Sequence, residues 1–268
     1  MSRPLRIEME KGLYHVTACG WERRVIVDSD RDREDWLRLL DRVATRCNWR
    51  MFAWVLMSNH FHLFLRTPEP NLSAGMHDLN SGFASLFNRR HGRAGSLFQG
   101  RFKAILVEDQ THAWELSRYV HLNPVRAKMV PLPEAYHWSS YGVYRFARAA
   151  KGAPSWLDWK TVLAEHSKDV RNARRAYRRF VERGIEDPPA SPLKSAVGGL
   201  FLGQVSWVER MRERLAEQPE DANVPQRQRL VWRPTKAEIF GLVENQFGVD
   251  TCVFRQVRRH GNDARTAA

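Results

Sequence analysis

The stretch Met51-Phe-Ala-Trp-Val-Leu-Met57, followed by His60-Phe-His-Leu-Phe-Leu65, decides the fold of this chain. Both segments are apolar and rich in strand formers, and they meet at Ser58-Asn59, so we predict an antiparallel pair of strands. Successive side chains of a strand point to opposite faces, so His60 and His62 project together while Phe61 packs behind them. Two imidazoles in a buried sheet need partners. The motif alone therefore fits a bidentate metal site or two hydrogen-bonded core histidines equally well.

The segments around this pair give the order β-α-β-β-α-β-α. Residues 12–18 and 102–107 have the composition of strands. Apolar residues at helical spacing predict helices over 30–48, 72–91 and 110–123. We therefore expect an α+β fold, a ferredoxin-like split βαβ domain with one added helix. We predict no particular strand order within its sheet.

After about residue 131 the pattern becomes one of helices alone, so we expect an all-α C-terminal region. Helices are predicted near 159–166, 171–183 and 206–217, and the prolines of 187–192 favour a linker. Residues 235–259 form the outline of a helix-turn-helix, which a three-helix structural module would share. The expected domains are a catalytic unit over 1–150, a basic helical extension and linker over 151–190, and an α-helical DNA-binding region over 191–268.

Composition indicates a folded protein with a polyanionic partner. Hydrophobic residues make up 43% of the 268 residues, which is ample for a core. The net charge is +13, carried mostly by arginine, whose planar fork binds phosphate, so nucleic acid is the expected partner. No apolar run has the length of a membrane span, and the N-terminal residues lack the core of a secretory signal. Three scattered cysteines exclude a zinc ribbon, and we expect a reduced, cytoplasmic protein.

The run Arg118-Tyr-Val-His-Leu-Asn-Pro-Val-Arg126 offers the groups that a two-histidine site lacks. Tyr119 and Asn123 are four residues apart, so a helix places them on one face, whereas His121 points away. Pro124 disfavours helical geometry at the preceding residue, so the helix is expected to end at Asn123. From the residues alone, Tyr119 is either a nucleophile or a packed tyrosine, and Asn123 either a ligand or a cap.

Two imidazoles and an amide oxygen would leave a bound cation strongly electrophilic, because none of these ligands carries charge. Magnesium prefers oxygen ligands and manganese accepts imidazole more readily, so Mg²⁺ or Mn²⁺ is the expected metal. Zinc is less favoured without a thiolate or carboxylate in the set.

Three motifs then occur in order: Leu56-Met-Ser-Asn-His-Phe-His-Leu63, Phe98-Gln-Gly-Arg-Phe-Lys103 and Ser117-Arg-Tyr-Val-His-Leu-Asn-Pro-Val-Arg-Ala127. Together they closely resemble the REP-associated tyrosine transposases, which are relatives of the single-tyrosine insertion-sequence transposases within the HUH endonuclease superfamily. Tyr14-His-Val-Thr17 and Trp138-Ser-Ser-Tyr141 support the resemblance, which covers roughly the first 145 residues. Residues 235–268 weakly resemble the DNA-binding domain of the replication initiator DnaA.

The resemblance implies a metal-dependent endonuclease and strand transferase acting on single-stranded DNA. His60 and His62 would be the paired metal ligands and Asn123 the third, while Tyr119 would form a 5′-phosphotyrosine link and release a 3′-hydroxyl. Family substrates are hairpins folded from short imperfect palindromes. Relatives often carry arginine where this chain has Cys19, which puts one phosphate contact in doubt.

Several basic residues are expected to contact DNA, although solvated surface positions would look the same in sequence. Trp21, Trp49 and Trp54 are interpreted as core residues rather than as stacking platforms. The expected DNA-binding set is Arg3, Arg6, Arg89, Arg90, Arg101, Lys103, Arg126, Arg174, Arg175 and Arg178.

A hairpin-binding protein without catalysis, and a metal nuclease that uses water, are the alternative functions. Insertion-sequence relatives work as dimers that exchange tyrosines, whereas the REP-associated branch is thought to act as monomers. Nothing in the chain itself decides the oligomeric state, and the resemblance slightly favours the monomer. It also implies a bacterial, nucleoid-associated protein in the cytoplasm with no membrane partner.

Overall fold

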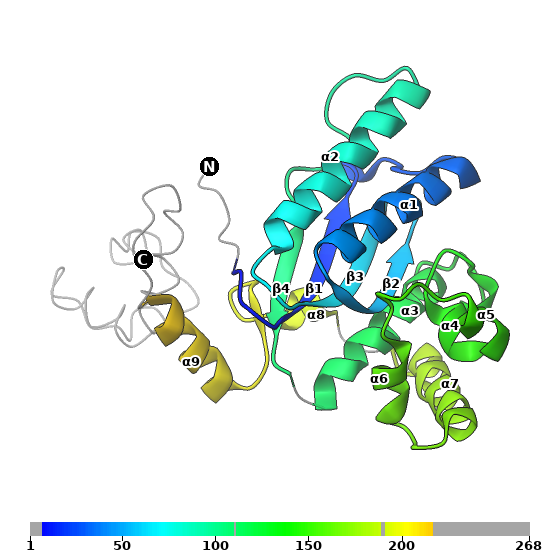
Figure 1. Cartoon of the computed structure of the whole chain (residues 1–268), viewed down its shortest axis with the longest axis vertical. Helices are drawn as coiled ribbons and strands as arrows, with labels where there is room; N and C mark the ends of the chain where they lie inside the picture. The colour runs from blue at the N-terminus through cyan, green and yellow to red at the C-terminus, as the bar shows by residue number, and fades with distance from the viewer. Residues whose placement is uncertain (1–6, 110, 189–190, 217–268) are drawn as a thin grey trace, which may run out of the picture. The chain divides into compact units, whose positions relative to one another are not determined.

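The computed structural model describes residues 7–109, 111–188 and 191–216, and Arg6–Val208 form one compact unit. Its centre is a five-stranded sheet with the order β2-β3-β1-β4-β5 (Figure 1). Four strands come from the predicted segments: β1 (Gly12–Cys19), β2 (Arg50–Leu56), β3 (His60–Thr67) and β4 (Lys103–Val107). All three pairings among these four are antiparallel. This confirms the α+β, ferredoxin-like prediction and supplies the strand order that the sequence left open.

Two helices cover one face of the sheet, α1 (Asp30–Arg46) and α2 (Leu72–Arg90) (Figure 1). Ser29 starts α1 with a capping box, in which its hydroxyl accepts from the Asp32 amide while the Asp32 carboxylate accepts from the Ser29 amide. Trp36 is fully buried and packs against Phe61 of β3, with ring centroids 5.1 Å apart. Phe61 therefore faces away from the two histidines, as the alternation predicts.

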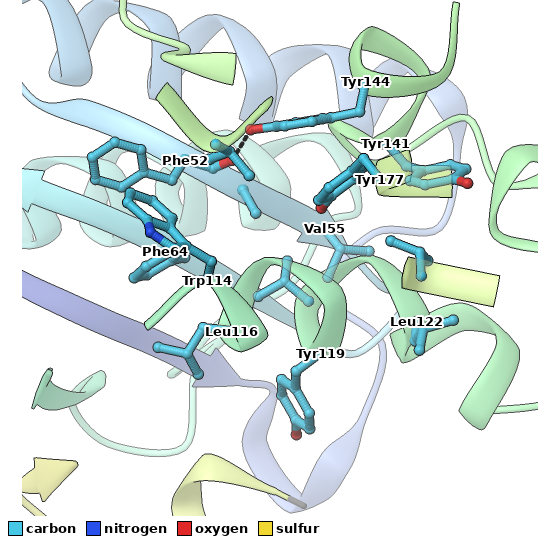
Figure 2. Close-up of a cluster of buried hydrophobic side chains, with 14 of the residues drawn as sticks. Phe52, Val55, Phe64, Trp114, Leu116, Tyr119, Leu122, Tyr141, Tyr144 and Tyr177 are labelled. Carbon is cyan, nitrogen blue, oxygen red and sulfur yellow. Dashed lines mark hydrogen bonds between the residues drawn. The ribbon is translucent and has the colours of Figure 1, made fainter. Parts of the chain in front are cut away.

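The other face is covered by α3 (Glu115–Arg126) and α6 (Trp159–Ala164), and α7 (Val170–Glu186) packs against both of these helices. Figure 2 shows the apolar cluster between these helices and the sheet, where Phe52 and Phe64 meet Trp114 at the start of α3. The remaining elements before residue 159 are short: η1 (Trp21–Arg23), η2 (Thr111–Trp114), η3 (Pro133–Ala135), α4 (Tyr141–Arg145) and α5 (Ala147–Lys151).

A polar network crosses this apolar layer at His121 of α3. The fully buried imidazole lies 2.7 Å from the Tyr177 hydroxyl of α7 and 2.7 Å from the Ser140 hydroxyl. The Tyr177 hydroxyl also donates to Ser117, at 3.0 Å. Burial lowers the pKa of His121 to about 3, so the ring is neutral. His121 thus fixes α3 to α7, and it points away from Tyr119 as the helical spacing predicts.

The region after residue 191 contains one element that the all-α prediction missed. Helix α8 (Pro192–Ser195) is followed by the two-residue strand β5 (Phe201–Leu202), which pairs in parallel with β4, and then by α9 (Val205–Ala216). The Glu108 amide donates to the Leu202 carbonyl at 2.8 Å, and the Glu108 carboxylate accepts from the Gln204 amide at 2.7 Å. The predicted helix-turn-helix over 235–259 lies outside the described residues.

Candidate active site

His60 and His62 of β3 lie on the sheet face that α3 covers. Their ring centroids are 5.0 Å apart and nearly perpendicular, which confirms that the two side chains project together. His62 is buried, and His60 is partly exposed at the end of the strand. In the neighbouring strand, Thr17 lies opposite His62 and Cys19 opposite His60. The pair therefore opens at the end of the sheet where β1 stops.

Each of these histidines has its Nδ1 atom occupied by a protein partner. The Nδ1 of His60 lies 2.7 Å from the Oδ1 of Asn59, an atom that can only accept, so this nitrogen carries the proton. The Nδ1 of His62 lies 2.9 Å from the Nε2 of His15. When His62 donates in that bond, the Nε2 atoms of both rings keep free lone pairs, which is the state that a metal ligand requires.

His15 of β1 is a third imidazole at this site that our sequence analysis did not select. It is fully buried and stacks on His62 with ring centroids 5.1 Å apart, while its Nδ1 has no hydrogen-bond partner among the described residues. Burial lowers the pKa of His15 to about 4. The signal was present in Tyr14-His-Val-Thr17, but only the pairing of β1 with β3 brings this ring to His62.

All three rings are held in the neutral form. Burial lowers the pKa of His62 well below its ordinary value, and the neighbouring His15, His60 and Arg126 lower it further. Burial, and then the charge of Arg23, lower the pKa of His60. Neutral imidazoles can bind a cation without first releasing a proton.

Tyr119 of α3 lies against these imidazoles within the same chain. Its ring centroid is 5.7 Å from that of His62 and 5.8 Å from that of His15, both in edge-on geometry. Figure 2 shows that it projects from the side of α3 opposite Tyr177. The guanidinium of Arg126 lies over the ring, 5.0 Å from its centroid, and the Ser191 hydroxyl is 3.5 Å from the phenol oxygen. Tyr119, the histidine pair and the Arg126 guanidinium therefore lie close together.

Asn123 lies one turn beyond Tyr119, but the prediction that α3 ends there is wrong. The helix continues to Arg126 with Pro124 inside it. Pro124 has no N–H to donate to the Val120 carbonyl. The Asn123 amide nitrogen substitutes for it, donating to the carbonyls of Tyr119 at 2.9 Å and Val120 at 3.4 Å. These two hydrogen bonds orient the Asn123 side chain through its nitrogen. They do not use the side-chain oxygen, which is the atom that a metal would bind.

The candidate metal ligands are two imidazoles and one amide oxygen, all uncharged. Among the described residues no group of three or more His, Cys, Asp or Glu side chains could hold a metal. A site at His60 and His62 would therefore be completed by the Asn123 oxygen, by water or by a phosphate.

The predicted DNA contacts differ in how exposed they are. Arg89, Arg101, Lys103, Arg126 and Arg175 lie at the surface, whereas Arg3 and Arg6 lie outside the described residues.

Three of the predicted DNA contacts form ion pairs or hydrogen bonds within the protein. Arg90 pairs with the buried carboxylates of Asp32 and Asp35, joining α2 to α1. Arg174 donates to the Val143 and Tyr144 carbonyls. Each of these two guanidinium groups would have to leave its protein partners to reach DNA, so their assignment as DNA contacts stays a prediction. Arg178 pairs with Glu182 at 2.7 Å on the surface of α7, so its charge is only partly available.

Helix α7 carries a row of arginines that the sequence analysis only partly selected. Its buried side is formed by Ala173, Tyr177 and Val181, which fixes the helical phase. At the surface of the same helix lie Arg171, Arg175, Arg179 and Arg183, each four residues from the next. We refer to these four residues as the α7 arginine row.

Of the three tryptophans interpreted as core, two are buried and one is not. Trp49 is 1% exposed and Trp54 8% exposed, whereas Trp21 is 48% exposed. The interpretation is therefore wrong for Trp21. The charged residues Glu22, Arg23 and Arg24 that follow it were the available signal.

Comparisons with known proteins bear on the segment that carries this site. A family model described as "Transposase IS200 like" matches residues 8–123, a span that includes His15, His60, His62, Tyr119 and Asn123. A solved REP-associated tyrosine transposase bound to a REP hairpin is 20% identical, with a TM-score of 0.47 over 63% of this chain and 93% of that one. A putative transposase from Deinococcus radiodurans is 20% identical, with a TM-score of 0.30 over 45% of this chain and 94% of that one. No curated protein matches the chain. None of the described helices is both long and apolar enough to cross a membrane.

Proposed function

We propose that this chain cuts and rejoins single-stranded DNA through a covalent bond to Tyr119, a proposal supported by the match of residues 8–123 to the model of IS200-like transposases. The observation that carries the proposal is the contact between the Tyr119 ring and the His62 imidazole, with centroids 5.7 Å apart in one chain. A nucleophile and a paired metal-binding motif then act on the same phosphate.

His60, His62 and Asn123 would hold the cation, the two histidines through Nε2 and the asparagine through its side-chain oxygen. The bound Mg²⁺ or Mn²⁺ would polarise a DNA phosphate and lower the barrier to attack on phosphorus. Asn59 and His15 contribute by occupying the two Nδ1 atoms, which sets the ring orientations.

Tyr119 would attack the phosphorus with its phenol oxygen. A Tyr–O–P bond forms and the bond from phosphorus to the 3′-oxygen breaks, so the 5′-phosphate stays on the protein. The released 3′-oxygen gains one proton, which balances the one that the phenol loses. The Arg126 guanidinium, 5.0 Å from the ring centroid, would stabilise the developing phenolate. Reversal by a different 3′-hydroxyl transfers the strand without external energy.

The motif resemblance implies hairpin substrates. Exposed Arg101, Lys103, Arg89 and Arg126 would contact phosphates near the site, and Arg175 with the other members of the α7 arginine row would contact the stem. Arginine at these positions suits phosphate recognition because its fork binds two oxygens at once.

The experiment uses a pool of 3′-labelled hairpin oligonucleotides with randomised single-stranded arms, incubated with the protein and Mn²⁺. We expect a labelled adduct that survives denaturation, since the tyrosine retains the 5′-phosphate of the labelled fragment. Tyr119→Phe should abolish the adduct while retaining hairpin binding.

Tyr141→Phe is the matched control, because the buried Tyr141 hydroxyl has no hydrogen-bond partner among the described residues. It should form the adduct at the parent level. Cleavage that persists in Tyr119→Phe would instead indicate a nuclease that uses water, and binding without any cleavage by the parent would indicate a non-catalytic hairpin-binding protein.

A further inference from the structure

The loop that follows β1 presents a large aromatic side chain to solvent beside the candidate active site. Trp21 is 48% exposed, and the residues after it, Glu22, Arg23 and Arg24, are exposed as well. A tryptophan at the surface forgoes a large burial energy, so its position requires a reason.

Backbone hydrogen bonds hold this loop in a closed conformation. The Arg23 and Arg24 amides donate to the carbonyls of Gly20 and Trp21, at 3.0 and 2.9 Å, and the Trp21 amide donates to Leu97 at 3.0 Å. A Cβ on Gly20 would lie 2.1 Å from the Arg24 carbonyl oxygen, so only glycine permits this closure. Glu22 and Arg23 both adopt positive φ, at 51° and 61°. Two adjacent non-glycine residues in this region store strain, which is typical of functional sites.

The same loop is bonded directly to the strand that carries the histidine pair. Cys19, two residues before Trp21, lies opposite His60 in the sheet. The Gly20 amide donates to the Asn59 carbonyl at 2.8 Å, and the Asn59 side chain donates to the Arg23 carbonyl at 3.0 Å while its oxygen holds His60. The charge of Arg23 reaches His60, whose pKa it helps to lower.

We propose that Trp21 is a stacking platform for an unpaired base next to the phosphate bound at His60 and His62, and that Arg23 binds the adjoining phosphate. The inference rests on the proposed function and adds a subsite for the single-stranded arm of the substrate. An unpaired nucleobase is the occupant because it offers a flat aromatic face to the indole and an anionic backbone to the guanidinium. Arg23 forms no ion pair with another described residue, whereas Arg24 is paired with Glu22 at 2.9 Å.

The test is equilibrium binding at fixed salt, with Tyr119→Phe as the parent so that no DNA is cleaved. The probes are one hairpin selected from the pool, the same stem without its single-stranded arm, and versions with one base of the arm removed at a time. Trp21→Ala should weaken binding of the armed hairpin by about 5- to 100-fold, the range expected for one stacked base. Trp21→Phe should retain most of the affinity.

Two comparisons distinguish a loss of base stacking from a general loss of DNA binding. Trp21→Ala should leave the armless stem unaffected, and one abasic position should weaken the parent but not Trp21→Ala. Phe146→Ala, which removes another aromatic ring that is 44% exposed, should leave both probes unchanged. Equal affinity of Trp21→Ala and the parent for the armed hairpin, or an equal loss on the armless stem, overturns the platform.

The proposed function can fail separately. If the chain with Tyr119 intact still forms the adduct while Trp21→Ala binds normally, only the stacking platform is wrong. If no member of the pool is bound or joined to the protein, both proposals fail.

Discussion

At the residue scale, the site depends on how the ring nitrogens of three histidines are shared. His15 and His62 form one buried hydrogen bond at 2.9 Å, and only one of the two rings can donate in it. Binding of a cation by the Nε2 of His62 requires that His62 donates and that the Nε2 of His15 accepts. In the proposed metal site, His15 would thus position the ligand His62.

We predict that His15→Phe, which fills the same space without an acceptor, weakens Mn²⁺ binding by about 10- to 100-fold. Titration calorimetry with Mn²⁺ on the folded protein measures this without DNA. His166→Phe is the control, since that ring is partly buried between α6 and α7 and also has an unpartnered nitrogen. Unchanged Mn²⁺ affinity in folded His15→Phe would contradict the positioning role.

A second prediction concerns acid stability and His121, whose pKa is lowered to about 3. The unfolded chain protonates this imidazole below about 6.5 while the folded chain does not, so the contribution is complete above that pH and is lost as the pH falls toward 3. Between pH 7 and 5 the free energy of unfolding should fall by about 2 kcal/mol from His121 alone.

Urea unfolding of the parent and His121→Gln across this pH range measures the effect. The variant should show a slope lower by up to about 1.4 kcal/mol per pH unit, because one titrating group is removed. His15 continues to titrate in both proteins, so the variant should keep part of the slope. Identical slopes in the two proteins would mean that His121 is protonated in the folded state.

Individual site residues were predictable to different degrees. The alternation of β3 suffices to place His60 and His62 together, and the helical period suffices to separate His121 from Tyr119. His15 and Trp21 could not be selected, because their importance depends on the register of β1 against β3 and on a closed loop, and neither is encoded by a local period. Pro124 led to a wrong prediction of the end of α3, because the Asn123 side chain replaces the backbone N–H donor that proline lacks.

At the scale of elements, strands β1 to β4 and helices α1, α2, α3, α6 and α7 follow from hydrophobic period. The strand β5 was missed because two residues are too short to show alternation. The helical phase of α7 is set by its buried residues Ala173, Tyr177 and Val181. That phase places Arg174 beside the buried stripe and the α7 arginine row away from it.

We predict that the α7 arginine row contacts DNA through phosphates alone. Replacing Arg175 and Arg179 together by glutamine should lower the slope of log affinity against log salt concentration by nearly 2, about 0.9 for each lost phosphate contact. The loss should be similar for hairpins of different stem sequence.

The matched control replaces Arg31 and Arg42 of α1, which are exposed on the helix layer across the sheet. It removes the same charge, and we expect it to leave the salt slope nearly unchanged. Equal slopes for both double variants would show that net charge, rather than the α7 arginine row, governs binding.

At the scale of the whole molecule, the proposed nucleophile and the proposed metal ligands lie together within one chain. The distance of 5.7 Å between the Tyr119 and His62 rings is reached without a second copy. We therefore predict that mixing Tyr119→Phe with His62→Ala, each inactive alone, restores no adduct formation. An enzyme that exchanges tyrosines between subunits would regain activity in the mixture, because one hybrid site would contain both intact groups. Each variant mixed with the parent serves as the control for inhibition.

Each edge of the four long strands is also bonded in part by other segments of the same chain. On one side β5 adds to β4, and on the other β2 is bridged at Met51 by Leu157 and at Val55 by Ser139. Free backbone groups along a margin are what allow a foreign strand to join and a sheet to grow from molecule to molecule. Bonds of this kind within the chain leave fewer backbone groups for a foreign strand, so they oppose the growth of a sheet from one molecule to the next.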